Sequence, residues 1–359
     1  MGSHPQSGKQ ARMTRLADIG LGFAALGASE KPPLADNLAE AIFDSVLELN
    51  IRRFDTSPLY GGGQSEKRLS KLLSQLPRDD YILSTKVGRY RPYGEVLTNQ
   101  RNNPTDRYDY SAGTTRRSIE ESMKRLGVDW LDIVYIHDCD NHIEEAAESA
   151  LPELVRMRSE GVIRQIGVGS NNSGTHEAML KRADLDILMV ANSYSLLAQD
   201  ADERLFPLCQ QQNISVELAA PFNSGILALG STAKSTYRYA APQPGILRRT
   251  RQIEAICHAH DVPLKRAALQ YCARHPAVGR VILGLVEPHE LRSNLADLQN
   301  DIPPALWTDL AKIGVSEPMA TGQQSLCRGL HRAISHEPST GPNHLPIQRK
   351  QDAVNCAKL

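Results

Sequence analysis

The sequence predicts an α/β fold, a (β/α)8 TIM barrel, and three observations lead to this class. Short apolar, β-rich runs alternate with longer segments of helical periodicity, which favours parallel strands joined by right-handed crossovers. Eight such runs fall within roughly 270 residues, the usual size of this barrel. The main competitor, a doubly wound open sheet, would usually carry a Gly-x-Gly-x-x-Gly turn. The early glycine runs at 20–22 and 61–63 lack that spacing.

The expected elements follow one another along the chain. The expected strands are Ile19–Phe23, Ile51–Asp55, Tyr81–Lys86, Ile133–His137, Ile163–Val168, Ile187–Val190, Ile214–Leu218 and Val281–Leu283. Helical patterns fall between most of them, at Asn37–Asn50, Thr114–Leu126, Ala147–Glu160, Leu247–His260 and Leu264–Arg274. The first helix repeats apolar residues at Leu38, Ile42 and Val46. Gly127 and Gly161 supply C-terminal stops for the second and third helices.

Composition narrows the class of protein. The 359 residues carry 41 basic and 41 acidic side chains, so nothing suggests nucleic acid or an anionic membrane as partner. No apolar stretch has membrane-spanning length, and the polar start lacks the apolar middle of a secretory signal. The six cysteines are scattered without a Cys-x-x-Cys pair, which is typical of reduced thiols. We therefore expect a cytoplasmic protein without a metal site; the oligomeric state stays open.

Three segments are expected. Residues 1–14 should form a flexible N-terminal segment, 15–317 the barrel, and 318–359 a disordered tail, because the tail has little periodicity. A polar, Tyr- and Arg-rich loop is inserted at about 88–112. Long loops inside compact domains are usually functional, although a flexible surface insertion would look the same.

Four polar residues stand at or just beyond predicted strand ends: Asp55, Tyr60, Lys86 and His137. In a barrel all strand C-termini converge on one face, so these side chains should meet there. An ammonium held by a carboxylate lowers the pKa of a neighbouring tyrosine, which would let Tyr60 exchange a proton near neutral pH. His137 could hold the same substrate oxygen. Singly, each residue also has an ordinary structural explanation; together they indicate redox chemistry on a carbonyl or alcohol.

The same segments carry a family resemblance. Residues 54–61, Phe-Asp-Thr-Ser-Pro-Leu-Tyr-Gly, resemble the Phe-Asp-Thr-Ala-x-x-Tyr-Gly segment of the aldo-keto reductase superfamily. Ser-Thr-Lys-Val at 84–87 is similar to its lysine strand, and Asp-Ile-Val-Tyr-Ile-His at 132–137 to its histidine strand. Other segments resemble the branch of D-threo-aldose 1-dehydrogenase, L-fucose dehydrogenase and pyridoxal 4-dehydrogenase. They include Tyr-Ser-Leu-Leu at 194–197 and His-Pro-Ala-Val at 275–278. The similarity runs from about residue 16 to about 315.

This resemblance implies a barrel with a nicotinamide cofactor and a catalytic tetrad of Asp55, Tyr60, Lys86 and His137. It also implies that Asn171, or Ser170 in a second register, lies near the carboxamide and that Tyr194 stacks on the nicotinamide ring. The residues expected along the pyrophosphate are Pro221, Phe222, Asn223, Ser224, Gly225 and Leu227. Many relatives have a glutamine where this chain has Ala191, a role that Asn192 could take over.

The segment after the eighth strand indicates which cofactor, NAD or NADP, the protein prefers. NADP-preferring relatives usually have a Lys-Ser pair and an arginine here, whereas this chain has Gly284, Leu285 and Glu290. Glu287 adds a second carboxylate, and Asn294 ends the segment of expected cofactor contacts. A 2′-phosphate would lack its cationic clamp, while a carboxylate suits a ribose hydroxyl. We therefore predict NAD as cofactor, with NADP possible if Arg292 reaches the adenosine end; the glutamates also suit a helix N-terminus.

The expected function is NAD-dependent oxidation of the anomeric carbon of a free aldose, of the L-fucose or D-threo-aldose type, to a lactone. Tyr60 would transfer the proton. The alternatives are a pyridoxal 4-dehydrogenase, an NADPH-dependent aldehyde or ketone reductase, and a non-catalytic regulatory barrel.

Overall fold

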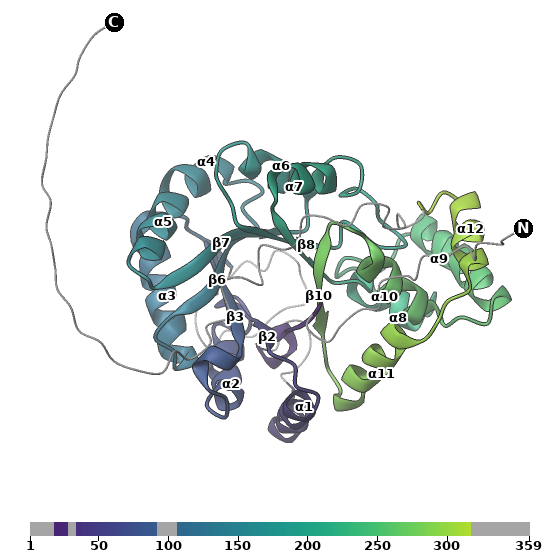
Figure 1. Ribbon diagram of the computed structural model, residues 1–359, viewed down its shortest axis with the longest axis horizontal. Helices are drawn as coiled ribbons and strands as arrows, with labels where there is room; N and C mark the ends of the chain where they lie inside the picture. The colour runs from purple at the N-terminus through teal and green to yellow at the C-terminus, as the bar shows by residue number, and fades with distance from the viewer. Residues whose placement is uncertain (1–17, 28–33, 92–105, 317–359) are drawn as a thin grey trace, which may run out of the picture. The chain divides into compact units, whose positions relative to one another are not determined.

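Eight parallel strands close into a barrel in the computed structural model, which describes residues 18–27, 34–91 and 106–316 (Figure 1). Around the barrel the order is β1-β10-β9-β8-β7-β6-β3-β2. The bounds are β1 Ile19–Gly22, β2 Arg53–Asp55, β3 Ile82–Val87, β6 Leu131–His137, β7 Ile163–Ser170, β8 Ile187–Ala191, β9 Ser215–Ala219 and β10 Val278–Gly284. The predicted barrel and its strands are confirmed, with ends that move by no more than three residues.

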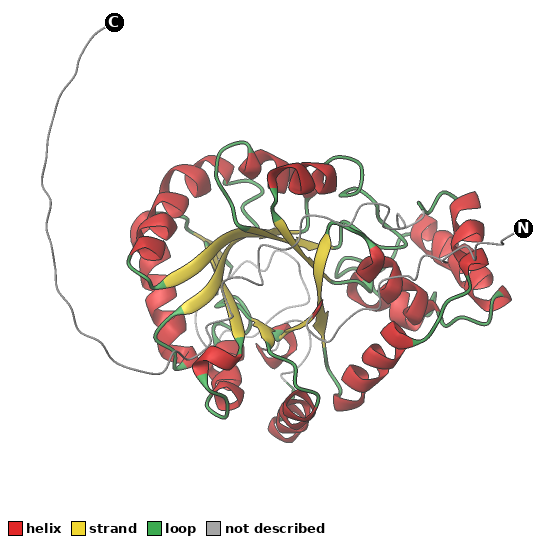
Figure 2. Ribbon diagram, viewed as in Figure 1, coloured by secondary structure: helices red, strands yellow, loops and turns green. Residues whose placement is uncertain are grey.

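Helices surround the barrel wall (Figure 2). Their bounds are α1 Asp36–Glu48, α2 Gln64–Leu73, α3 Ala112–Leu126, α4 Ile143–Glu145, α5 Leu151–Ser159, α6 Ser173–Leu180, α7 Leu205–Gln212, α8 Ile226–Leu229, α9 Pro244–Ala259, α10 Leu264–Arg274, α11 Pro288–Gln299 and α12 Pro304–Lys312. A π-helical turn, Ala146–Ala150, precedes α5, and 3-10 turns lie at Ala24–Gly27, Arg78–Asp80 and Asn223–Gly225. Among the helices that the sequence did not assign, α2, α6 and α7 have only eight to ten residues and therefore show few periods of their apolar pattern.

The core has two parts. A large apolar layer fills the space between strands and helices, and a small cluster inside the barrel contains Ile133, Tyr135, Ile187, Met189 and Ile282. Side chains two residues apart on a strand share a face. The residues at the ends of β2, β3 and β6 therefore form the next layer of side chains, at the carboxyl ends of the strands.

The expected insertion begins with a short antiparallel ribbon. β4, Arg89–Tyr90, pairs with β5, Arg107–Tyr108. The rest of the insertion, residues 92–105, lies outside the described residues, as do the segments 1–14 and 318–359 on which we made predictions.

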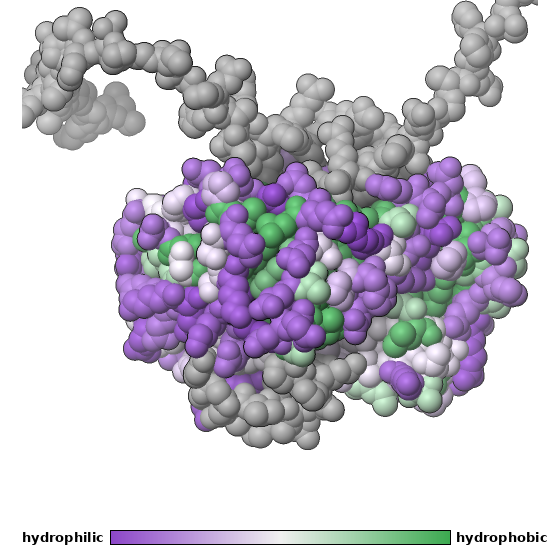
Figure 3. Space-filling view, turned by 90° about the horizontal axis from the view of Figure 1, so that it is seen from below, coloured by the Kyte–Doolittle hydropathy of each residue, from purple (hydrophilic) through white to green (hydrophobic). Residues whose placement is uncertain are grey.

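The face of the molecule in Figure 3 is largely polar. Hydrophilic residues cover most of the face in Figure 3, with separate small hydrophobic areas. Over the described ranges, no helix combines the length and apolar character needed to cross a membrane. The four described cysteines, Cys139, Cys209, Cys257 and Cys272, are buried and form no disulfide.

Candidate active site

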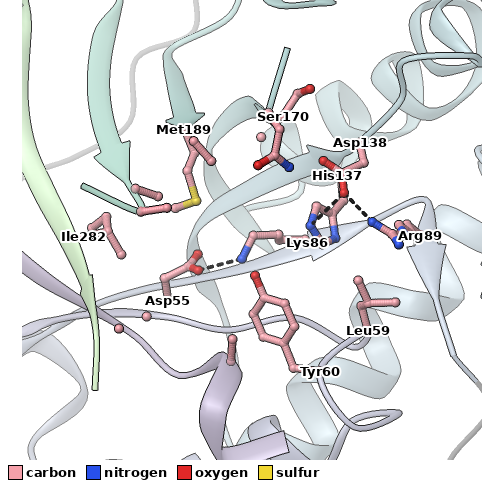
Figure 4. A pocket seen from close by; sticks show the side chains of 18 of the residues that line it. Asp55, Leu59, Tyr60, Lys86, Arg89, His137, Asp138, Ser170, Met189 and Ile282 are labelled. Carbon is pink, nitrogen blue, oxygen red and sulfur yellow. Dashed lines mark hydrogen bonds and ion pairs between the residues drawn. The ribbon is translucent and has the colours of Figure 1, made fainter. Parts of the chain in front are cut away.

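The four predicted residues meet in one cavity at the carboxyl ends of the strands. It has a volume of about 270 Å³, and Asp55, Tyr60, Lys86 and His137 all line it (Figure 4). Asp55 ends β2, Lys86 lies one residue before the end of β3, and His137 ends β6. Three neighbouring parallel strands therefore bring three distant sequence segments together.

Asp55 and Lys86 form a buried ion pair. Their Oδ2 and Nζ atoms are 2.6 Å apart, and the side chains are only 4% and 2% exposed. Nζ also donates to the backbone oxygen of Thr56 at 2.8 Å. Burial alone would lower the pKa of Lys86, but Asp55 and then Tyr60 raise it above its ordinary value. The lysine is therefore a fixed cation.

Tyr60 points its hydroxyl toward this cation (Figure 4). The Nζ of Lys86 lies 4.8 Å from the centroid of the tyrosine ring. Burial raises the pKa of Tyr60 above 10, and the Lys86 ammonium opposes that rise without cancelling it. The expectation of a pKa lowered toward neutral was therefore wrong, because it counted the charge and not the burial.

The loop that carries Tyr60 is held by a close backbone approach. A Cβ added to Gly27 would lie 2.3 Å from the carbonyl carbon and oxygen of Tyr60. Gly61 has a φ of 63°, and a Cβ there would lie 1.8 Å from the oxygen of Gly27. Only glycine fits this contact, and the contact fixes the position of the Tyr60 backbone.

His137 is buried beside Tyr60. Their ring centroids are 6.1 Å apart at an interplanar angle of 88°. Burial, and then the positive charges of Lys86 and Arg89, hold the pKa of His137 well below its usual value. A neutral imidazole can donate to, or accept from, a substrate oxygen.

Charged residues form one side of the cavity, and two of them are arginines of the predicted Tyr- and Arg-rich insertion. Arg89 donates to Asp138 Oδ2 at 2.5 Å and to Asp106 Oδ2 at 2.7 Å. Arg91 donates from Nε to Asp106 Oδ1 at 2.9 Å. Arg89, Arg91 and Asp138 line the cavity. Their partners lie 15 to 49 residues away in sequence, so no local motif could reveal these ion pairs.

The two residues expected near the carboxamide lie at the cavity. Ser170 and Asn171 both line the cavity. The Ser170 hydroxyl donates to Asp140 at 3.0 Å and accepts the Asn172 N–H at 3.0 Å, so it is already engaged. Asn171 Oδ1 accepts from Asn192 Nδ2 at 2.7 Å, which leaves the Asn171 amide group as donor. Asn192 is fully buried and holds Asn171 in place, a different task from the one expected of it.

The stacking expected of Tyr194 was wrong. Its side chain is 1% exposed and stacks on Tyr271 at 4.9 Å, with His275 edge-on at 4.9 Å. These partners come from α10 and from the residue that follows it, far along the chain. The cavity wall is formed instead by three small residues, Ala191, Ala219 and Ala220, and by Tyr239 on a later loop.

The segment expected along the pyrophosphate has an unusual backbone. Ala220, Asn223 and Ser224 have φ values of 54°, 47° and 68°. The Ser224 hydroxyl accepts the N–H of Tyr239 at 3.1 Å, so the two loops are joined. Asn223 and Leu227 are fully buried, so their side chains hold the loop from within the protein. Of the remaining predicted residues, Phe222 and Gly225 are partly exposed and Pro221 is buried.

The segment expected to bind the adenosine end of the cofactor leads into α11. Glu290 accepts the N–H groups of Val286 and Glu287 at 2.7 and 3.1 Å, as part of a capping box with Glu287. Both glutamates therefore cap the N-terminus of α11. Arg292 is paired with Glu48 on α1. Asn294 is 3% exposed, and its Oδ1 has no hydrogen-bond partner within the part of the chain that the structure describes.

These residues fit a nicotinamide dinucleotide. A buried acceptor without a partner is costly, so Asn294 Oδ1 is suited to a donor such as an adenine amino group. Gly284 lines the cavity at the end of β10, and a Cβ there would meet nothing within 4 Å. Asn171 would offer its amide to the carboxamide at the other end.

Comparisons with known proteins agree with this architecture. The chain matches the aldo/keto reductase family over residues 18–314. It is 37% identical over 306 residues to the D-threo-aldose 1-dehydrogenase of Pseudomonas sp, covering 82% of this chain and 93% of that protein. It is 34% identical over 333 residues to the pyridoxal 4-dehydrogenase of Microbacterium luteolum, covering 83% and 94%. A solved aldo-keto reductase from Bacillus halodurans, in its holo form, superposes with a TM-score of 0.65 at 26% identity, covering 85% and 94%. The chain therefore belongs to the aldo/keto reductase family, whose members are oxidoreductases that act on carbonyl or CH–OH groups with a nicotinamide cofactor.

Proposed function

We propose that this protein oxidises the anomeric carbon of a free aldose to a lactone with NAD as cofactor. The observation that carries the proposal is the buried Asp55–Lys86 pair beside Tyr60 and His137, inside one cavity. The aldose follows from the resemblance to the Pseudomonas D-threo-aldose 1-dehydrogenase.

The side chains divide the work in a definite way. His137, held neutral, donates a hydrogen bond to the oxygen of the anomeric hydroxyl. Tyr60 accepts the hydroxyl proton, and the fixed Lys86 cation stabilises the phenolate that makes this possible. A bound nicotinamide cofactor supplies the hydride acceptor. Asn171 and Asn294 would hold its two ends.

The balance of charge at the cavity favours a neutral, hydroxylated substrate. Three cations, Lys86, Arg89 and Arg91, meet three carboxylates, those of Asp55, Asp106 and Asp138. A carboxylated or phosphorylated substrate would therefore find no uncompensated positive charge. Arg91 Nη1 is buried and has no hydrogen-bond partner among the described residues. We infer that it donates to a sugar hydroxyl, since an arginine nitrogen only donates.

NAD is favoured at the adenosine end by two observations. Glu290 and Glu287 place carboxylates at the start of α11, and Arg292 is engaged with Glu48. A 2′-phosphate, which carries nearly two negative charges, would meet repulsion there.

A panel of initial rates tests the proposal. Free aldoses and pyridoxal are offered with NAD and with NADP, and formation of the reduced cofactor is recorded. We expect turnover of at least one aldose, with a higher kcat/KM for NAD than for NADP. Turnover of pyridoxal alone would assign the activity of the Microbacterium relative instead. A strong preference for NADPH in aldehyde reduction would contradict the proposal.

A further inference from the structure

A layer of buried polar side chains fills the barrel directly below the tetrad. Arg53, Ser84 and Tyr135 lie two residues before Asp55, Lys86 and His137 on the same three strands, so each shares a face with the residue above it. Glu217 joins them from β9. All four are at most 2% exposed. Barrel interiors are usually filled by branched apolar residues, and burying charge is costly. A charged layer at this position is therefore unusual.

The layer is organised around one carboxylate. Arg53 forms a two-pronged contact with Glu217, from Nε at 2.7 Å and from Nη2 at 2.5 Å. Tyr135 donates its hydroxyl to Glu217 at 2.8 Å, and Arg280 adds a bond at 2.9 Å. Burial alone would raise the pKa of Glu217, but Arg53 and the other donors lower it to about 2. Arg53 and Glu217 are therefore both charged and form a buried ion pair.

One hydroxyl connects this layer to the tetrad. Arg53 Nη1 donates to Ser84 Oγ at 2.9 Å, and Ser84 Oγ donates to Asp55 Oδ1 at 2.6 Å. The direction is fixed because a guanidinium only donates, so the serine proton is free to point at Asp55. The other oxygen of Asp55 receives Lys86. Each oxygen of this carboxylate thus has its own donor.

We propose that Ser84, backed by Arg53 and Glu217, is a positioning residue that orients Asp55 so that Lys86 is held beside Tyr60. The inference rests on the proposed role of the tetrad in proton transfer, and it does not depend on which sugar is the substrate. Without the Ser84 bond, the Asp55 carboxylate can rotate away from Lys86. The ammonium then loses its fixed place, and the Tyr60 phenolate loses part of its stabilisation.

The neighbouring residue on β3 offers a matched control. Thr85 points out of the barrel, and its hydroxyl donates to Glu66 on α2 at 2.6 Å. Both hydroxyls are fully buried and both bind a carboxylate, but Thr85 lies on the opposite face of the strand from the tetrad. Ser84→Ala and Thr85→Val therefore each delete one buried hydroxyl from the same strand.

The test compares pH profiles of kcat/KM for the wild type, S84A and T85V in the full chain with cofactor. In S84A we expect the apparent pKa assigned to Tyr60 to rise by about one pH unit, so the rate at neutral pH falls about tenfold and partly recovers at alkaline pH. Cofactor affinity should stay unchanged. T85V should show the wild-type pH profile of kcat/KM. Its denaturant midpoint should fall by about as much as that of S84A, because each variant loses one buried hydroxyl.

If S84A does not fold, Ser84→Cys replaces it as the test variant. A thiol is a weaker donor than a hydroxyl, so the pH profile of kcat/KM should shift in the same direction by a smaller amount. An S84A profile that coincides with the wild type would overturn the inference and leave the layer as barrel filling. If the wild type oxidises no aldose but reduces aldehydes, the proposed function fails. The same pKa rise can then still be sought in the reduction reaction, so the two failures are distinguishable.

Discussion

The acidity of Tyr60 is set by two opposing effects, burial and the Lys86 charge, and burial is the larger of them. The same residue must release a proton in carbonyl reduction and accept one in alcohol oxidation. A pKa above 10 makes the neutral phenol the dominant form at neutral pH, which suits a proton donor. Oxidation requires the phenolate, so the direction of the reaction is coupled to pH at this one side chain.

The first prediction concerns that coupling. Aldose oxidation should speed up as the pH rises toward the Tyr60 pKa, with kcat/KM growing about tenfold per pH unit below it. Aldehyde reduction by the same enzyme should stay level over this range, because the phenol that donates the proton is already the dominant form, and should fall only above the Tyr60 pKa. The measurement is a pair of pH profiles, one in each direction. An oxidation rate that is flat between neutral and alkaline pH would show that another group carries the proton.

At the scale of single elements, the three strand-end residues of the site were predictable, whereas the contacts between distant segments were not. Asp55, Lys86 and His137 were found because a polar residue that closes an apolar strand is visible in the sequence. Tyr194 was misassigned because its stacking partner, Tyr271, comes from a helix dozens of residues away. The ion pairs around Asp106 and the cavity wall at Ala219 and Ala220 have no local sequence signal either, since they arise where segments distant in the chain pack together.

The turn that follows β1 should control catalysis through its backbone. Gly27→Ala would drive a methyl group into the carbonyl of Tyr60, 2.3 Å away, and displace the loop that carries the hydroxyl. We expect kcat to fall by at least tenfold, because displacements of about 1 Å can cost a hundredfold in rate, while cofactor affinity changes little.

Gly113→Ala on α3 is the matched control. A Cβ at that position meets nothing within 4 Å, and alanine favours the helix, so activity should be unchanged and stability slightly higher. Steady-state kinetics and cofactor titration separate the two variants. Normal kcat in G27A would mean that the close approach does not set the position of Tyr60.

Over the whole molecule, buried neutral histidines tie stability to pH. His176 is fully buried, with Nε2 3.1 Å from the Met189 oxygen, and burial lowers its pKa to about 4. His137 shifts in the same direction. In the unfolded chain both take up a proton below about pH 6.5, whereas the folded state resists protonation. Their contribution is therefore present above pH 6.5 and is lost as the pH falls toward 4.

The free energy of unfolding should accordingly decrease by on the order of 3 kcal/mol for His176 alone between pH 6.5 and 4. Urea unfolding at closely spaced pH values measures it. His176→Asn should flatten the dependence between pH 6.5 and 4.5, at the cost of lower stability at pH 7. His258→Asn, on an exposed part of α9, should keep the wild-type slope. Equal slopes for H176N and the wild type would refute the assignment.

The barrel itself was predictable at this scale because its strands repeat one pattern eight times. The polar layer of Arg53, Ser84 and Glu217 was not, since in sequence each of these residues looks like an isolated polar position within an apolar strand. Closure of the barrel is what brings β2 and β9 within bonding distance across its interior.

The most direct test of the whole account is the rate of NADH formation from NAD and a free aldose, measured for the wild type and for Tyr60→Phe. The variant keeps the ring and removes only the hydroxyl. We predict steady turnover by the wild type, loss of at least a thousandfold in kcat for Y60F, and equal NAD binding by both proteins. Turnover of an aldose by Y60F at a comparable rate would contradict the assignment of Tyr60. Failure of the wild type to oxidise any aldose, despite binding NAD, would contradict the proposed reaction.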